Sequence, residues 1–248
     1  MQKSKIEWCD YTFNPVTGCL HGCPYCYARK IAHRFGQEEN EKGKIHSIQK
    51  RWPNNFDDYP FGFDPTFYYY RLDEPQGKKK PQNVFVCSMA DLFGSWIPDH
   101  WIQQVFEACE KAPQHRYLFL TKNPKGIWRN GVPILKRAWY GITVTRQNEL
   151  LCITDLELIG RRFISIEPIL EPIDLRVCIS RSVPPFTDWV IVGSETGTRK
   201  DKVIPKREWV ENIVNECRKQ NVPVFMKNNL KEIWGESLIQ EYPWKEEP

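Results

Sequence analysis

The strongest constraint on the fold of this 248-residue chain is a series of short apolar runs between residues 84 and 226. The runs are continuous rather than alternating and are rich in β-branched and aromatic residues, which is typical of strands buried in a parallel sheet. Segments with helical spacing lie between most of them, so the order predicts βαβ units with right-handed crossovers. The runs are VFVC (84–87), YLFL (117–120), WYGITV (139–144), FISI (163–166), WVIVG (189–193) and VPVFM (222–226), and the helical segments are 99–111, 146–160 and 206–220.

A further strand is expected at residues 12–18, which brings the number of strands to seven. Seven parallel strands suit an open barrel better than a closed one of eight strands. The predicted fold class is therefore α/β, a partial (β/α) barrel of the TIM type. A hydrophobic content of 41% can bury one core of this size, so a single domain over residues 1–248 is expected.

Residues 37–82 interrupt this pattern. They are polar and rich in proline, and they end in the basic run Lys78–Lys80. This composition predicts an irregular insertion. Two interpretations stay open, a lid or rim over the barrel mouth and a solvated loop with no role.

Composition and charge limit the class of protein. No apolar run reaches eighteen residues and the first residues do not resemble a signal peptide, so a soluble, cytoplasmic protein with no membrane partner is expected. The net charge of +4 is compatible with an anionic partner but falls short of the concentrated basic face of a nucleic-acid-binding domain, and charge alone does not decide the partner. A small-molecule substrate is expected, and a nucleic-acid partner is less expected. Nine cysteines in such a chain favour metal binding or catalysis over disulfides.

Three of the cysteines, Cys19, Cys23 and Cys26, stand at C-x-x-x-C-x-x-C spacing. A tight loop with this spacing can present three thiolates to one four-iron, four-sulfur cluster and leave the fourth iron open. The turns that such a loop needs are supplied by Gly18, Gly22 and Pro24.

The alternative is a zinc knuckle with Cys9, His21 or His33 as the fourth ligand. Structural zinc usually takes two spaced pairs of ligands, and no second Cys/His pair follows downstream. The other cysteines stand singly and are expected to be small core residues rather than ligands of a second cluster. They are Cys87, Cys109, Cys152, Cys178 and Cys217.

The C-x-x-x-C-x-aromatic-C loop after a first strand resembles the signature of the radical S-adenosylmethionine (SAM) superfamily. The segments IEWCDYTFNPVTGC, SMADLF, RFISIEPIL and DWVIVGSETG resemble a bacterial and phage-associated branch of small three-cysteine proteins. The resemblance covers nearly the whole chain apart from residues 37–82. It implies a 4Fe-4S cluster on Cys19, Cys23 and Cys26, and SAM lying across the carboxyl ends of the strands.

Polar residues follow every predicted strand, at the positions that face the active site in a parallel barrel. The alternative for any single Ser, Thr or Asp is a helix cap. The residues are Ser88, Met89, Asp91, Thr121, Lys122, Thr143, Thr145, Glu167, Ser194, Glu195 and Lys227.

The resemblance implies roles in SAM binding for some of these residues. Residues 88–91 match the motif that binds the methionyl amino group, although an Asp stands where a Glu is common and no Gly-Gly precedes it. By position, Ser88, Met89 and Asp91 are candidates for the methionyl group, Thr143 and Thr145 for the ribose, and Tyr25 for the adenine.

Glu167 and Glu195 are the candidate substrate ligands. A carboxylate in a barrel mouth is costly to desolvate unless it is paired, so it generally has a function. One carboxylate can accept both N–H donors of a guanine-like edge. The alternative for Glu167 is a salt bridge to Arg161 or Arg162.

The chain is similar to the queuine lyases of base salvage, which remove the cyclopentenyl group of queuine and leave 7-aminomethyl-7-deazaguanine. The similarity implies C–N bond cleavage on a purine-like base and an electron donor such as flavodoxin or ferredoxin. Lys122, Asp91 and Lys227 are the candidates for proton transfer. The alternatives are radical modification or repair of a polynucleotide bound through residues 37–82, and a non-enzymatic zinc or iron–sulfur protein.

Overall fold

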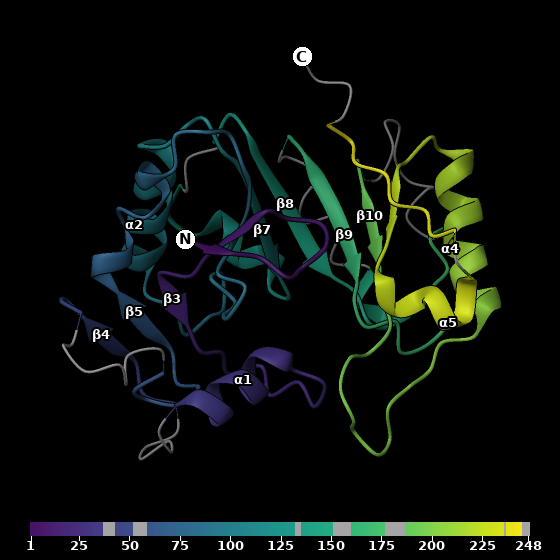
Figure 1. Ribbon diagram of the computed structural model, residues 1–248, viewed down its shortest axis with the longest axis horizontal. Helices are drawn as coiled ribbons and strands as arrows, with labels where there is room; N and C mark the ends of the chain where they lie inside the picture. Colours follow the sequence, from purple (N-terminus) through teal and green to yellow (C-terminus); the bar gives the residue numbers. More distant parts are fainter. Residues whose placement is uncertain are drawn as a thin grey trace. The chain divides into compact units, whose positions relative to one another are not determined.

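The computed structural model describes residues 1–36, 43–51, 59–131, 135–150, 160–176, 187–235 and 237–244 (Figure 1). The chain divides into two compact units, Met1–Ala138 and Trp139–Pro248. The fold is mixed α/β with a mostly parallel sheet, as the apolar runs predicted. Closure into a partial barrel and the single-domain organisation stay predictions.

The first unit contains one end of the large sheet. β1 (Gln2–Lys3) pairs antiparallel with β2 (Tyr11–Phe13), whereas β2, β6 (Asn83–Val86) and β7 (Arg116–Thr121) are parallel. In this register Phe13 lies opposite Val86, which lies opposite Phe119. The three strands therefore end at the same edge.

The helix α2 (Asp99–Glu110) connects β6 to β7. Its buried residues Ile102, Val105, Phe106 and Cys109 recur at helical spacing, which is why this segment folds as an amphipathic helix. The Phe106 ring stacks on that of Phe119 with 4.8 Å between centroids. This contact is part of the core of the first unit.

The segment predicted as one strand at 12–18 is split between two sheets. β2 ends at Phe13, and β3 (Val16–Thr17) instead pairs antiparallel with β5 (Thr66–Tyr68). Pro15 lies between the two strands, and proline has no N–H to donate to a sheet.

Residues 37–82, predicted to be irregular, contain ordered elements in their described part. β4 (His46–Ile48) pairs parallel with β5, and the 3-10 helices η1 (Tyr69–Arg71) and η2 (Pro75–Gly77) follow. All three residues of β5 are buried, because aromatic and β-branched side chains there pack on both faces. A fully solvated loop is therefore wrong for β5, while residues 37–42 and 52–58 lie outside the described residues.

The second unit contains the strands β8 (Ala138–Thr143), β9 (Arg162–Ile166), β10 (Val190–Val192) and β11 (Val224–Met226), all parallel and in this order. The helix α4 (Arg207–Lys219) connects β10 to β11 and buries Val210, Ile213, Val214 and Cys217. Most of the helix predicted at 146–160 lies outside the described residues. The remaining elements are the 3-10 helices η3 (Pro124–Gly131) and η5 (Asn228–Leu230) and the helices α1 (Tyr27–Phe35) and α5 (Lys231–Trp234).

None of the described helices has the length and apolar character that crossing a membrane requires.

Gly18, directly after β3, connects the two sheets of the first unit. Its N–H donates to the Met89 carbonyl at 2.9 Å, and it forms a parallel bridge with Ala90. Its φ is +85°, and a Cβ atom there would lie 2.2 Å from the Asp64 carbonyl oxygen. Only glycine fits this position.

We therefore predict that Gly18→Ala destabilises the protein far more than Gly22→Ala. Gly22 also has a positive φ of +70°, but a Cβ atom there meets nothing within 4 Å. Gly22→Ala should cost about 1–2 kcal/mol of backbone strain, and Gly18→Ala should add about 1–3 kcal/mol of overpacking. Urea unfolding of both variants measures the difference. Equal stabilities would contradict the close packing at Gly18.

Candidate active site

The three-cysteine loop runs from Gly18 to α1. Cys26 is the N-cap of α1, and its Sγ accepts a hydrogen bond from the Arg29 N–H at 3.3 Å. The Cys26 N–H in turn donates to the Cys23 carbonyl at 3.2 Å. The predicted ligands Cys19, Cys23 and Cys26 are all partly buried, and all three lie in this one short loop.

The surroundings of Cys19 and Cys26 disfavour their thiolate forms. Burial, with smaller contributions from Asp91 and the neighbouring thiols, raises the pKa of Cys19 to about 12. The hydrogen bond from the His21 backbone N–H to the Cys19 sulfur lowers this pKa, but by less than burial raises it. Burial also raises the pKa of Cys26, against the hydrogen bond from the Arg29 N–H. Without metal these thiols are protonated at neutral pH, so a metal must displace their protons when it binds.

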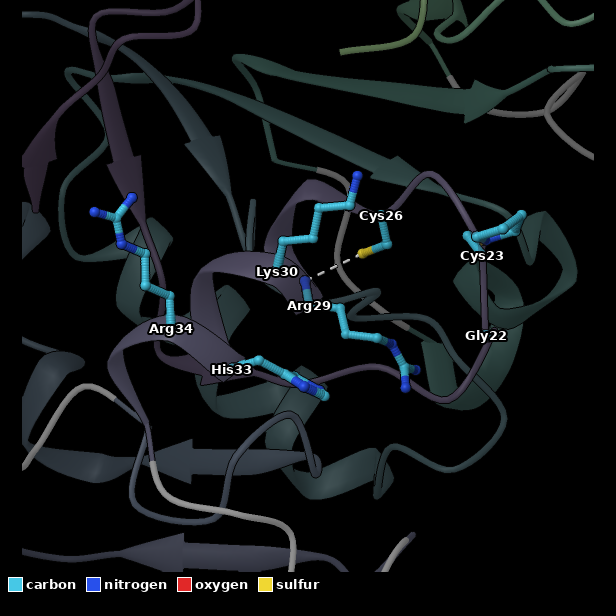
Figure 2. Close-up of a pocket in the computed structure, with 8 residues that line it drawn as sticks. Gly22, Cys23, Cys26, Arg29, Lys30, His33 and Arg34 are labelled. Carbon is cyan, nitrogen blue, oxygen red and sulfur yellow. Dashed lines mark hydrogen bonds between the residues drawn. The ribbon is translucent and has the colours of Figure 1, made fainter. Parts of the chain in front are cut away.

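A cavity of about 580 Å³ lies beside the loop (Figure 2). Cys23 and Cys26 line it together with residues of α1, and none of its lining residues is acidic. Figure 2 shows the Cys26 sulfur directed toward the backbone of α1. The full lining is Gly22, Cys23, Pro24, Cys26, Arg29, Lys30, His33 and Arg34.

This donor set fits an iron–sulfur cluster. A cluster on three thiolates is anionic, and the basic side chains beside the cavity favour an anion. Among the described residues, no group of three or more His, Cys, Asp and Glu side chains is placed to hold one metal ion. A four-iron cluster does not need such convergence, because each thiolate binds a different iron.

Two of the proposed zinc ligands have other partners. The Cys9 thiol donates to the Ser4 hydroxyl at 3.2 Å, and His21 Nε2 lies 2.7 Å from Asp91 Oδ2. A zinc knuckle that used Cys9 would have to break its contact with Ser4, whereas His21 could still offer Nδ1 with its Asp91 contact intact. The third, His33, lines the cavity.

Asp91, predicted as a SAM ligand and proton carrier, is buried with both carboxylate oxygens occupied. Oδ1 accepts from the Thr121 hydroxyl at 2.7 Å and from the Phe93 N–H at 3.1 Å. Oδ2 accepts from the Lys122 N–H at 2.9 Å and lies 2.7 Å from His21 Nε2. The carboxylate thus joins the cysteine loop to the end of β7.

Ser88 and Met89 are held by a residue that the sequence did not single out, Asn14. Asn14 Oδ1 accepts from the Ser88 hydroxyl at 3.2 Å and from the Met89 N–H at 3.3 Å. The Ser88 carbonyl accepts from the Tyr27 hydroxyl at 2.6 Å. Asn14 follows β2. Its position at the end of a strand is the feature by which the sequence could have identified it as a candidate site residue.

Tyr25 and Lys122, predicted for different roles, lie together. The Lys122 ammonium is buried and lies 5.5 Å from the centre of the Tyr25 ring, a cation–π distance. The pair joins the cysteine loop to the residue after β7, so the candidates of the first unit gather around the loop.

In the second unit, Glu167 and Lys227 form an ion pair. Lys227 Nζ lies 3.0 Å from Glu167 Oε2, whereas Glu167 Oε1 is buried and accepts no hydrogen bond from a described residue. A Cβ atom at Gly193 would lie 2.9 Å from the Lys227 side chain and 3.3 Å from that of Glu167. Gly193 therefore leaves space for the pair. The partner of Glu167 is thus Lys227, and not Arg161 or Arg162 as the alternative proposed.

Glu195 has a different environment. It is buried, and its two carboxylate oxygens each accept from the Arg199 guanidinium at 2.8 Å. This hydrogen-bonded pair raises the pKa of Arg199. Glu195 lacks the open acceptor that Glu167 has.

The predicted ribose ligands also differ from each other. Thr145 is buried, and its N–H and hydroxyl both donate to Glu149 Oε2, at 2.6 Å and 3.0 Å. Thr143 ends β8 and lies beside Ser165 of β9, whose buried hydroxyl has no partner among the described residues. The Thr145 hydroxyl therefore has a side-chain acceptor of its own, and the ribose roles of Thr143 and Thr145 stay predictions.

The single cysteines in the described residues are buried, as predicted. Burial raises the pKa of both Cys87 and Cys217 to about 12 and the pKa of Cys109 well above its usual value. Cys152 and Cys178 lie outside the described residues.

Comparison with known structures places this geometry in a fold class. Spore photoproduct lyase complexed with dinucleoside spore photoproduct aligns with a TM-score of 0.60 at 10% identity, over 91% of this chain and 78% of that chain. Two variants of spore photoproduct lyase align over the same shares with TM-scores of 0.58 and 0.59 at 9% and 10% identity. Identity this low establishes a shared fold alone.

A family model matches residues 3–241, so the chain belongs to the family described as "Protein of unknown function (DUF5131)". No protein with a curated description matches the sequence.

We predict that Asp91→Asn destabilises the protein by about 1–3 kcal/mol, because an amide NH₂ group would face a donor inside a buried network. Urea unfolding measures the loss. The matched control is Asp73→Asn, since Asp73 makes an exposed contact with Gln76. A loss in Asp91→Asn no greater than in the control would contradict the four contacts of Asp91.

Proposed function

We propose that the protein is a radical SAM enzyme whose cluster is held by Cys19, Cys23 and Cys26. The observation that carries the proposal is the loop with three thiols beside a cavity lined by basic residues. The resemblance of the C-x-x-x-C-x-aromatic-C motif supports it, as does the fold shared with spore photoproduct lyase, itself a radical SAM enzyme. We also propose that the α/β fold of this chain is the partial barrel of the radical SAM superfamily.

A 4Fe-4S cluster with SAM at its open iron supplies a 5′-deoxyadenosyl radical after one-electron reduction. The chain's own groups hold the cofactor. We assign the backbone of residues 88–90 to the methionyl group, because Asn14 and Tyr27 fix Ser88 and Met89. Tyr25 is assigned to the adenine and Thr143 to the ribose. Asp91 acts through His21 and Lys122 rather than on SAM directly.

We infer that the substrate is a deazaguanine base bound by Glu167. Its buried Oε1 is an open acceptor for an N–H donor of the base, and Lys227 holds Oε2. A carboxylate fixed in this way forms charge-assisted hydrogen bonds with a guanine-like edge. Glu195 is the weaker candidate because Arg199 occupies both of its oxygens.

The reaction that fits this assignment is C–N cleavage of queuine to 7-aminomethyl-7-deazaguanine. When the C–N bond breaks, the amine nitrogen that stays on the deazaguanine base requires a proton. We assign this proton transfer to Lys227, which lies beside Glu167, and Lys122 is the second candidate. This choice of substrate rests on the resemblance to queuine lyases expected from the sequence.

A second candidate function is radical repair of a polynucleotide. It is favoured by the fold, since the similar spore photoproduct lyase was observed with a dinucleoside photoproduct. Polynucleotide binding depends steeply on salt, whereas binding of a neutral base does not. Titration of an oligonucleotide at two salt concentrations therefore separates the two functions.

We predict that Cys19→Ala, Cys23→Ala and Cys26→Ala each lose the cluster, because only these three thiols share a loop. Cys109→Ala and Cys217→Ala are the controls, since both residues lie buried in helices. Iron and sulfide analysis after anaerobic reconstitution measures the cluster. The wild type, reduced with dithionite, should convert SAM to 5′-deoxyadenosine and methionine. Full iron content in Cys23→Ala, or an intact reduced cluster without SAM cleavage, would contradict the assignment.

We predict that Glu167→Gln weakens queuine binding by about 2–4 kcal/mol, because an amide donor replaces one acceptor and faces a donor of the base. Glu195→Gln is the matched control and should bind queuine as the wild type does. Isothermal titration of queuine into SAM-loaded protein measures both. Wild-type affinity in Glu167→Gln would refute the role of this carboxylate, and no binding to the wild type would refute the substrate.

A further inference from the structure

The helix α1 presents an apolar stripe to solvent. Tyr27, Ile31 and Phe35 are 42%, 37% and 62% exposed. Their spacing of four residues puts them on one side of the helix, while Ala28 and Ala32 are buried on another. The Tyr27 hydroxyl donates to the Ser88 carbonyl, which anchors the stripe at its start.

A basic stripe lies next to the apolar one. Lys30 and Arg34 are also four residues apart, and they leave α1 in a different direction from Arg29 and His33 (Figure 2). Neither forms an ion pair with a described residue, although the Arg34 guanidinium lies 5.2 Å from the centre of the Phe35 ring. No residue of α1 is acidic.

Positive charge is thus concentrated on this helix. Its nine residues include three Lys and Arg residues and no acidic one, so the helix carries +3. Such a local field attracts an acidic partner and accelerates its association.

Both stripes adjoin the cysteine loop. α1 begins at the residue after Cys26, and Lys30 and Arg34 line the same cavity as Cys23 and Cys26. Leu20, between the first two cysteines, is 39% exposed and adds a further apolar side chain. A partner on this face would lie close to the cluster.

We propose that a small acidic protein carrying single electrons on a flavin or an iron–sulfur centre docks on this face and reduces the cluster. The docking face is defined as Leu20, Tyr27, Lys30, Ile31, Arg34 and Phe35. One electron leaves the carrier, which is oxidised, and enters the cluster, which is reduced. This proposal rests on the proposed function, and it adds the site of electron entry.

The composition of the face favours a protein partner over a nucleic acid. Protein interfaces combine aromatic and aliphatic residues at their centre with charged residues at the rim. Single-stranded nucleic acids bind to basic grooves by stacking bases on aromatic rings. Tyr27 and Phe35 offer rings for stacking, but Leu20 and Ile31 add exposed aliphatic side chains, which fit a protein surface better than stacked bases.

The test is the rate of cluster reduction by flavodoxin hydroquinone, measured anaerobically by stopped-flow absorbance. The variant Lys30→Glu/Arg34→Glu should be reduced at least about tenfold more slowly than the wild type, because the attraction is reversed. Because Lys30 and Arg34 also line the cavity beside the thiols, iron and sulfide content is measured in each variant and the rates are expressed per cluster. The loss of rate with flavodoxin should exceed any loss with dithionite, a small reductant that needs no docking surface. The matched control is Lys79→Glu/Lys80→Glu, with the same change of charge on exposed lysines elsewhere, and it should behave as the wild type does.

Three results would overturn the proposal. They are an unchanged flavodoxin rate in Lys30→Glu/Arg34→Glu, an equal loss in the control, and a loss of oligonucleotide binding with flavodoxin reduction intact. If the charge reversal prevents folding, Lys30→Gln/Arg34→Gln is measured in its place with the same criteria.

Failure of the proposed function is recognised separately. If the protein holds no cluster, titration of oxidised flavodoxin into cluster-free protein at low salt still tests the docking face. Weaker binding to Lys30→Glu/Arg34→Glu than to the wild type supports the face, and equal binding overturns it.

Discussion

The contact on which the first unit most depends is the buried carboxylate of Asp91. It accepts from the Thr121 hydroxyl and from the Lys122 backbone at the end of β7, and it holds the imidazole of His21. The Phe93 N–H completes its shell. A buried carboxylate with several short hydrogen bonds fixes the groups around it. Asp91 therefore holds the cysteine loop to the end of β7, together with the Tyr25–Lys122 contact.

Local pattern predicted the elements and the loop, since both depend on residues close together in the chain. Continuous apolar runs gave the parallel strands, and the spacing of Cys19, Cys23 and Cys26 gave the three-thiol loop. Contacts between distant residues were not accessible in this way. The split of residues 12–18 depends on pairing with β5, more than forty residues away. Asn14 was missed because its partners are some seventy-five residues further along the chain.

The two candidate carboxylates show why sequence setting alone does not assign a function. Glu167 and Glu195 each follow a buried strand, and both were predicted to bind the substrate. Arg199 satisfies both oxygens of Glu195, whereas Lys227 contacts one oxygen of Glu167 and the other accepts no hydrogen bond from a described residue. Buried polar atoms are nearly always paired in proteins, and this difference is the ground on which we propose Glu167 as the substrate ligand.

The central claim is a cluster on three thiols with one iron left for SAM. Electron paramagnetic resonance of the dithionite-reduced protein, recorded with and without SAM, tests it most directly. The account predicts a signal from a reduced 4Fe-4S cluster whose shape changes when SAM is added, because SAM binds the iron that no cysteine holds. A cluster signal that SAM leaves unchanged, or no cluster signal in reconstituted protein, would contradict it.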